Sequence, residues 1–249
     1  MKTSSLSGGA ACPLAAPRLY ETDILRRAAG NTLRPGGLTL LQEGLQRVNW
    51  PAGTRVLDIG CGTGTTAAYL RQTQSLQAIG LDLSEQLLAE GAAANPGLPL
   101  IRSRAEKLPI ADGSLDGMTC ECVLSLVNDP LGTLREFSRV LKDGGQLLFS
   151  DIYRRRNITN QELPDNCCFA GATSRERLLD WLHKAGFTVQ LWQDRSHLLA
   201  ELAARLAWQN GSLIEFWSQF AANGDGRPMQ QAVKAMRPGY CLVVAAKQG

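Results

Sequence analysis

The stretch Val56–Gly64, VLDIGCGTG, constrains the fold of this chain more than any other. Its apolar start predicts a buried parallel strand, and residues 63–70 predict the beginning of a helix. Gly60, Gly62 and Gly64 form the turn between them. Glycine adopts dihedral angles that other residues avoid, and it leaves the backbone bare for a ligand. The following helix offers unpaired N–H groups and the positive end of its dipole, so the stretch predicts a nucleotide-type ligand site.

The size and composition fit one α/β domain with an elaboration, or two small domains. The chain has 249 residues, of which 44% are hydrophobic and 20% charged, as in an ordinary globular protein. A net charge of +3 is too small to indicate a nucleic acid or an anionic membrane as partner. No signal-peptide core and no run of about eighteen apolar residues is visible. We therefore expect a cytoplasmic protein in which the seven cysteines are reduced thiols.

Strands and helices alternate at short intervals after the glycine turn, and this alternation predicts a doubly wound parallel sheet. The predicted strands are residues 56–59, 78–82, 98–101, 115–123 and 146–152. Ligands of such sheets bind outside the carboxyl ends of the strands. The residues at or just beyond those ends are Gly60–Gly64, Asp82, Ala105 and Glu106, Glu121 and Cys122, and Asp151. We expect all of them to face one crevice.

Asp82 lies 22 positions after Gly60, at the end of the second predicted strand. A carboxylate at this position can accept hydrogen bonds from both hydroxyls of a ribose. Each charge-assisted bond contributes roughly 1.5–3 kcal/mol. A dinucleotide fingerprint needs its third glycine one position later than Gly64, where this chain has Thr65. The spacing therefore disfavours NAD(P).

Four motifs in order carry a family resemblance: VLDIGCGTG, an acid ending the next strand, AEKLP followed by DGSLD, and RVLKDGGQLLFSD. Together they resemble a class I S-adenosylmethionine-dependent methyltransferase, with relatives of the ubiquinone/menaquinone and arsenite methyltransferase types. The resemblance is dense over Thr54–Ile152. It implies a Rossmann-like, doubly wound sheet of seven strands, mostly parallel, with an antiparallel last strand at Tyr240–Lys247 and helices on both faces. It also implies S-adenosylmethionine as cofactor and S-adenosylhomocysteine as product.

The resemblance implies where the cofactor binds. Asp58 and the glycine turn border the methionine part, although Asp58 can instead brace the turn. Asp82 holds the ribose, and Glu121 begins the segment beside the reacting methyl. The implied contact residues are Asp58, Gly60, Cys61, Gly62, Gly64, Asp82, Leu83, Ala105, Glu106 and Glu121.

The remaining sequence predicts a cover over the crevice. We expect residues 1–50 to form an N-terminal helical cap and residues 51–249 to form the methyltransferase domain, with a helical insertion at about 195–237. Tyr20 either closes over the pocket or packs. Arg34, in the sequence RPGG, is either a loop residue or the partner of a carboxylate on cofactor or substrate.

Three cysteines leave two interpretations open. Cys122 lies near the end of the fourth predicted strand, and Cys167 and Cys168 follow the fifth. Thiolates bind soft acceptors such as trivalent arsenic, so these residues either hold the substrate or are buried as small hydrophobic groups. The spacing lacks the CxxC pairs of zinc sites, and no metal site is predicted.

Methyl transfer depends mainly on alignment, which can supply about 7–11 kcal/mol. An acceptor that loses a proton needs a base, and the candidates by location are Glu121, Asp151 and Tyr153. The sequence thus predicts a small-molecule methyltransferase, acting as monomer or homodimer without a nucleic-acid partner or membrane span. The alternatives are methylation of a thiol-bound metalloid such as arsenite, and a non-catalytic S-adenosylmethionine-binding module.

Overall fold

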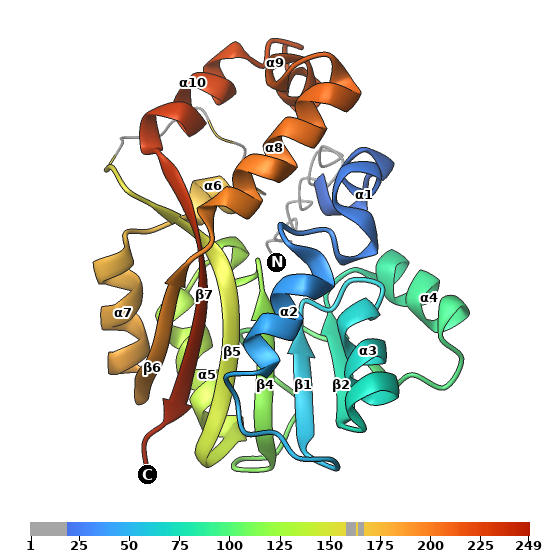
Figure 1. Cartoon of the computed structure of the whole chain (residues 1–249), viewed down its shortest axis with the longest axis vertical. Coiled ribbons are helices and arrows are strands. Elements are labelled where there is room, and N and C mark those ends of the chain that lie inside the picture. Colours follow the sequence, from blue (N-terminus) through green and yellow to red (C-terminus); the bar gives the residue numbers. More distant parts are fainter. Residues whose placement is uncertain (1–18, 158–162, 164–166) are drawn as a thin grey trace, which may run out of the picture.

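A seven-stranded sheet forms the centre of the computed structural model, which describes residues 19–157, 163 and 167–249 (Figure 1). The strand order is β3-β2-β1-β4-β5-β7-β6. Strands β1 to β5 pair in parallel, and β7 is antiparallel to both of its neighbours. The strands are β1 (Arg55–Ile59), β2 (Gln77–Asp82), β3 (Leu100–Arg102), β4 (Leu115–Glu121), β5 (Leu141–Arg154), β6 (Phe187–Asp194) and β7 (Pro238–Lys247). The predicted doubly wound fold with an antiparallel last strand is confirmed.

Helices cover both faces of the sheet, because successive residues of a buried strand point to opposite sides. Leu57 of β1 packs in one apolar cluster with helices α5 and α7, whereas Val56 packs in another with α2 and α3. Helix α4 contacts β2 and β3. These helices are α2 (Gly37–Leu45), α3 (Thr65–Gln74), α4 (Glu85–Ala94), α5 (Pro130–Val140) and α7 (Arg175–Lys184).

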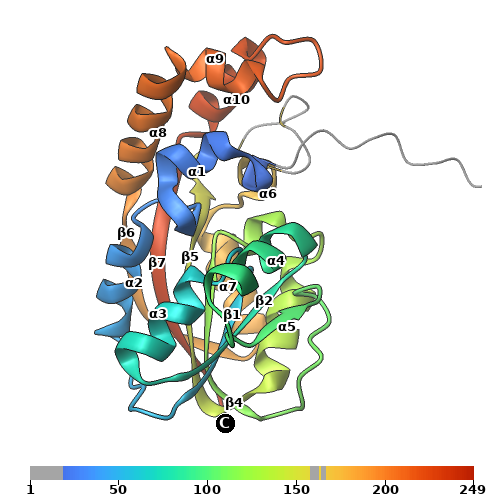
Figure 2. The same cartoon turned by 90° about the vertical axis from the view of Figure 1, so that its right-hand side faces the viewer.

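A further group of helices lies beyond the carboxyl ends of β1 and β4, at the top of Figures 1 and 2. Ala28 of α1 shares an apolar cluster with Leu202 of α8, Phe216 of α9 and Met229 of α10. Residues from the two expected covering segments thus pack together, while α2 packs against the sheet instead. The group comprises α1 (Asp23–Ala29), α6 (Cys168–Gly171), α8 (Ser196–Asn210), α9 (Leu213–Ser218) and α10 (Arg227–Met236), with 3-10 turns at Leu19–Glu21, Gly30–Thr32 and Leu124–Leu126.

The end of one strand differs from expectation. Strand β4 ends at Glu121 instead of residue 123, because Cys122 adopts the left-handed region with φ 59°. Helix α7 begins after Ser174, whose hydroxyl accepts from the Arg177 N–H at 3.3 Å. Within the described ranges, no helix is both long and apolar enough to cross a membrane.

Candidate functional site

The glycine turn after β1 closes tightly against the loop that follows β4. Gly60, Gly62 and Gly64 have φ values of 65°, 55° and 74°, which favour glycine. A Cβ on Gly60 would lie 2.2 Å from Val123 Cγ2, so a side chain has no room there. Gly64 is the N-cap residue of α3. Gly60 is exposed and Gly62 half-buried, so the beginning of the turn is open to a ligand, whereas Gly64 is buried.

Asp82 links this turn to the next strand. Its Oδ2 accepts a hydrogen bond from the Gly62 N–H and its Oδ1 accepts one from the Ser84 N–H, both at 2.8 Å. A carboxylate has about four acceptor positions, so each oxygen retains one. Asp82 is half-buried and lines a cavity, which gives these remaining positions access to a ligand.

That cavity, called here the glycine-turn cavity, has a volume of about 420 Å³. Most residues that the sequence assigns to the cofactor or the substrate line it. They are Tyr20, Arg34, Asp58, Gly60, Cys61, Gly62, Asp82, Leu83, Ala105, Glu106, Glu121 and Cys122. Gly64 is not among the lining residues.

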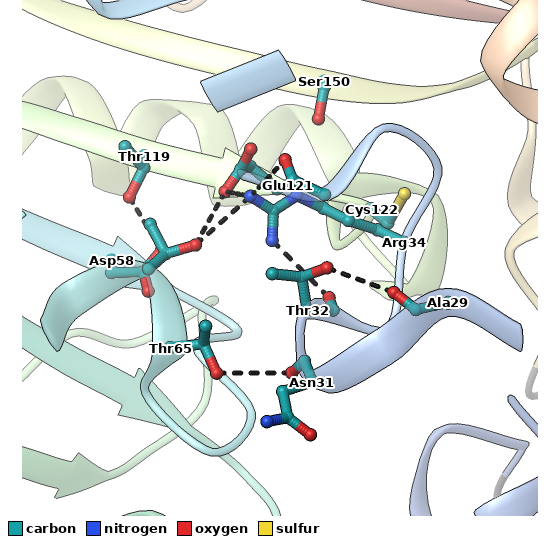
Figure 3. Close-up of polar contacts among 12 residues, drawn as sticks. Ala29, Asn31, Thr32, Arg34, Asp58, Thr65, Thr119, Glu121, Cys122 and Ser150 are labelled. Atoms are coloured by element: carbon teal, nitrogen blue, oxygen red, sulfur yellow. Dashed lines mark hydrogen bonds and ion pairs between the residues drawn. The ribbon is translucent and has the colours of Figure 1, made fainter. Parts of the chain in front are cut away.

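Two residues that line this cavity, Arg34 and Glu121, form a buried ion pair (Figure 3). Arg34 Nη2 lies 2.6 Å from Glu121 Oε2, and each side chain is only 6% exposed. The Thr66 hydroxyl lies 3.2 Å from the same two atoms. Burial lowers the pKa of Arg34, but Glu121, together with smaller contributions from Tyr240, Asp58 and Cys122, outweighs this effect and leaves the pKa raised. Burial also raises the pKa of Glu121 despite the opposing charge of Arg34.

Asp58 presents an unpaired oxygen beside this ion pair. Its Oδ1 accepts from the Thr119 hydroxyl at 2.7 Å, whereas its Oδ2 is buried without a hydrogen-bond partner among the described residues. Burial, followed by the charge of Glu121, raises the pKa of Asp58 to about 7. In the same part of the chain that the structure describes, Arg34 Nε is also buried without a partner. An unpaired acceptor and an unpaired donor from residues that line the same cavity fit the ammonium and carboxylate of an amino acid.

A second cavity of about 240 Å³, called here the apolar chamber, adjoins the first under the covering helices. Tyr20, Leu33 and Cys122 line both cavities. Its other walls come largely from α8, α9 and α10 and include Leu199, Leu202, Leu206, Phe216, Trp217 and Val233. Cys168 lines this chamber, and Cys167 lines neither cavity.

Two of the three predicted base candidates lie away from both cavities. Asp151 accepts from the Ser125 N–H at 3.0 Å and from the Ser125 hydroxyl at 2.6 Å, so it braces the loop after β4. Tyr153 donates to Asp194 Oδ2 at 2.5 Å and packs edge-on against Trp192. The expectation that all strand ends face one crevice is therefore wrong for Asp151, because β5 continues to Arg154 and Asp151 lies within the strand. Only Glu121 lines the glycine-turn cavity.

Several lining residues were missed because they lie in loops without a motif. Asn31 and Thr32 come from the turn after α1, and Val127 and Asn128 precede α5. Thr119, which donates a hydrogen bond to Asp58, is a polar residue within a predicted buried strand, and this is the sequence feature that could have indicated its role. Among the described residues, no group of three His, Cys, Asp or Glu side chains is arranged to hold a metal ion.

Comparison with known proteins points to one enzyme class. Residues 57–149 match the family model described as a methyltransferase domain. The chain is 36% identical over 100 residues to a demethylmenaquinone methyltransferase of Beutenbergia cavernae, covering 40% of this chain and 41% of that protein. It is 32% identical over 154 residues to an arsenite methyltransferase of Aquipseudomonas alcaligenes, covering 55% and 44%. The chain thus spans less than half the length of either relative.

A solved structure extends the likeness to nearly the whole chain. The phosphoethanolamine N-methyltransferase 2 of Haemonchus contortus, solved with phosphomonomethylethanolamine and S-adenosylhomocysteine, superimposes with a TM-score of 0.71. The match covers 91% of this chain and 57% of that one at 19% identity. Identity this low supports a common fold.

Proposed function

Because residues 57–149 form a class I S-adenosylmethionine-dependent methyltransferase domain, we propose that this chain transfers a methyl group from S-adenosylmethionine to a small molecule. One observation carries the proposal: the Asp82 carboxylate is fixed by the Gly62 and Ser84 N–H groups and still faces the glycine-turn cavity. A carboxylate held in this way suits the two hydroxyls of a ribose. Charge-assisted bonds of this kind contribute about 1.5–3 kcal/mol each.

The other end of the cofactor fits the orphan groups of the same cavity. The unpaired Asp58 Oδ2 would accept from its ammonium group, and the unpaired Arg34 Nε would donate to its carboxylate. Leu83 and Ala105 would border the adenine. When bound there, S-adenosylmethionine supplies a methyl group on a positively charged sulfur.

The residues of the chain would act mainly by positioning. Arg34 and Glu121 hold each other in a buried pair, so the Glu121 carboxylate is in place without a bound ligand. Tyr20 and the segment from Asn31 to Arg34 line the cavity and would exclude water from part of it, which strengthens electrostatic interactions there. Fixed alignment of this kind can supply about 7–11 kcal/mol of the barrier. We assign Glu121 a role in orienting groups beside the methyl, since Arg34 and Thr66 already contact its carboxylate.

The metalloid alternative lacks support in the described part of the chain. Cys122 and Cys168 line the apolar chamber, but Cys167 does not. The Cys122 Sγ lies 3.3 Å from the Tyr240 hydroxyl and is already paired. Burial raises the pKa of Cys122, which disfavours the thiolate that a soft acceptor requires. Packing therefore accounts for these cysteines better than a three-thiol site does.

Calorimetry with S-adenosylhomocysteine tests the proposal. Asp82→Ala should weaken binding about 100-fold or more, the equivalent of about 2.7 kcal/mol from two lost bonds. Asp180→Ala removes a carboxylate of the surface pair with Lys184 and should leave the affinity unchanged. Equal affinities for Asp82→Ala and the unmodified protein would refute the ribose assignment.

A second measurement separates an enzyme from a non-catalytic binding module. The protein is incubated with radiolabelled S-adenosylmethionine and a fractionated pool of small metabolites. We expect label in a small product together with one equivalent of S-adenosylhomocysteine. Tight cofactor binding without turnover on any fraction would favour the non-catalytic module.

A further inference from the structure

The apolar chamber differs from the glycine-turn cavity in what its walls offer a ligand. Its walls are aliphatic and aromatic side chains, and Lys234 is the one charged residue among the described residues that line it. Lys234 itself is exposed, so the interior of the chamber holds no charge. Burying an ion in such surroundings without a partner is costly, whereas apolar surface is stabilised by about 25 cal/mol per Å².

Tyr20 brings a hydrogen-bonding group to this chamber. Its hydroxyl oxygen is buried and, among the described residues, has no oxygen or nitrogen hydrogen-bond partner; the Cys168 thiol, a weak acceptor, interacts with it. Burial, followed by the charges of Cys168 and Cys167, raises the pKa of Tyr20 well above its usual value. Tyr20, Cys122 and Cys168 all line the chamber.

Two other polar side chains that line the chamber are hydrogen-bonded. The Cys122 thiol lies 3.3 Å from the Tyr240 hydroxyl, and the Gln230 Oε1 accepts from Trp217 Nε1 at 3.0 Å. A buried hydroxyl whose only neighbour is a weak sulfur acceptor is uncommon in proteins and calls for an explanation. The position of Tyr20, on the wall shared by both cavities, makes a ligand the simplest one.

We propose that the apolar chamber binds the methyl acceptor, an uncharged and mainly apolar molecule with one oxygen that accepts a hydrogen bond from Tyr20. This inference rests on the proposed methyl transfer and names the substrate class. Tyr20, Leu33 and Cys122 form the passage between the chamber and the glycine-turn cavity. An acceptor oxygen held by Tyr20 therefore lies at the side of the chamber that faces the cofactor.

Tyr20 acts here as a donor. Its raised pKa keeps the hydroxyl protonated at neutral pH, so it cannot remove a proton from the acceptor. Its contribution is orientation: one hydrogen bond fixes which end of an apolar molecule points towards the methyl group. In an otherwise featureless apolar chamber, this bond selects one of the possible ligand orientations.

Three bicyclic probes test the chamber directly. Their dissociation constants are measured by fluorescence with the protein saturated with S-adenosylhomocysteine at neutral pH. We expect 1-naphthol to bind about fivefold more tightly than naphthalene, as one neutral hydrogen bond predicts. We expect 1-naphthoate to bind at least tenfold more weakly than 1-naphthol because its charge must be desolvated. Equal or tighter binding of 1-naphthoate would overturn the proposed substrate class.

Tyr20→Phe isolates the hydrogen bond. It should abolish the preference for 1-naphthol over naphthalene without weakening naphthalene. Tyr69→Phe is the matched control, because Tyr69 lies on α3 and lines neither cavity. A preference for 1-naphthol that survives Tyr20→Phe would overturn the role of Tyr20.

A pair of neighbouring alanines on α8 tests the site itself. Ala203 lines the chamber, whereas Ala204 is exposed and lines neither cavity. Ala203→Phe should fill the chamber and weaken both neutral probes more than tenfold, and Ala204→Phe should change neither. The affinity of both variants for S-adenosylhomocysteine should remain unchanged.

The two readouts separate two kinds of failure. If S-adenosylhomocysteine does not bind to the unmodified protein, the proposed function fails. If it binds but the probes do not, or bind equally to both alanine variants, only the assignment of the chamber fails.

Discussion

The glycine-turn cavity takes its walls from the ends of neighbouring strands, whereas the apolar chamber takes its walls from helices far apart in the sequence. Asp58 is the penultimate residue of β1, and Asp82 and Glu121 end β2 and β4; these strands are adjacent in the sheet. The chamber combines Leu25 of α1 with residues of α8 to α10, roughly 170 to 210 positions further on. Sheet pairing therefore positions the first site, and packing of side chains positions the second.

The two regions also differ in how their residues are held. Three carboxylates of the glycine-turn cavity have a fixed donor: Thr119 for Asp58, Gly62 for Asp82 and Arg34 for Glu121. The chamber has aromatic contacts instead, such as Phe216 with Trp217 at 4.9 Å between ring centroids. A substitution in the chamber alters shape without breaking a polar network. Acceptor preference can thus change while cofactor recognition is preserved.

The largest expected effect concerns the polar network. Arg34→Ala leaves Glu121 buried without its cation, and breaking such a pair by removing one partner costs about 3–5 kcal/mol. The free energy of unfolding, measured with urea, should fall by this amount, and affinity for S-adenosylhomocysteine should fall with it. Arg102→Ala breaks the exposed pair with Glu85 and should cost at most about 1 kcal/mol. Similar losses of stability for both variants would show that the buried pair of the glycine-turn cavity stabilises the protein no more than an exposed pair does.

A smaller and more selective effect is expected in the cover. Phe216 is 2% exposed and lines the chamber, so Phe216→Ala should lower the free energy of unfolding by about 3 kcal/mol. Binding of 1-naphthol should be lost, while affinity for S-adenosylhomocysteine changes less than about twofold. Trp208→Ala, at a side chain 90% exposed on α8, is the control and should change stability by less than about 0.5 kcal/mol. Equal loss of both ligands in Phe216→Ala would show that the two cavities are not independent.

The smallest expected effect is a dependence of the free energy of unfolding on pH. Asp58 and Asp151 have pKa values of about 7 and about 6, raised first by burial. The folded protein therefore binds more protons than the unfolded chain between about pH 4 and 7, and the free energy of unfolding should decrease as pH rises through this window. The slope should reach at most about 1.4 kcal/mol per pH unit for each group.

Urea unfolding at several pH values measures this slope. Asp58→Asn should remove the part of it that extends to about pH 7, whereas the exposed Asp143→Asn should leave it intact. Saturating S-adenosylhomocysteine should also reduce it, because an ammonium beside Asp58 lowers the pKa of that carboxyl. A slope unaffected by Asp58→Asn would contradict the assignment.

The sequence predicts these two regions to very different extents. The apolar run before Gly60, the acid at Asp82 and the alternation of strands specify the sheet and its ligand-binding edge by local rules. No local sequence rule predicts that Tyr20 lies beside Cys168 or that α1 packs against α8, because those contacts depend on how distant helices pack. The partner of Asp151 could not be predicted either, because Ser125 lies in a 3-10 turn after β4 for which the sequence has no signal.

The apolar cluster that joins α1 to α8, α9 and α10 consists of segments that are synthesised at different times. Residues 19–29 emerge from the ribosome long before residues 196–236, yet Ala28 packs against Leu202, Phe216 and Met229 in the finished protein. Strands β1, β2 and β4 are complete by residue 121 and can begin to associate while the later helices are still being made. Until then the apolar face of α1 lacks these partners and is exposed to solvent on the nascent chain.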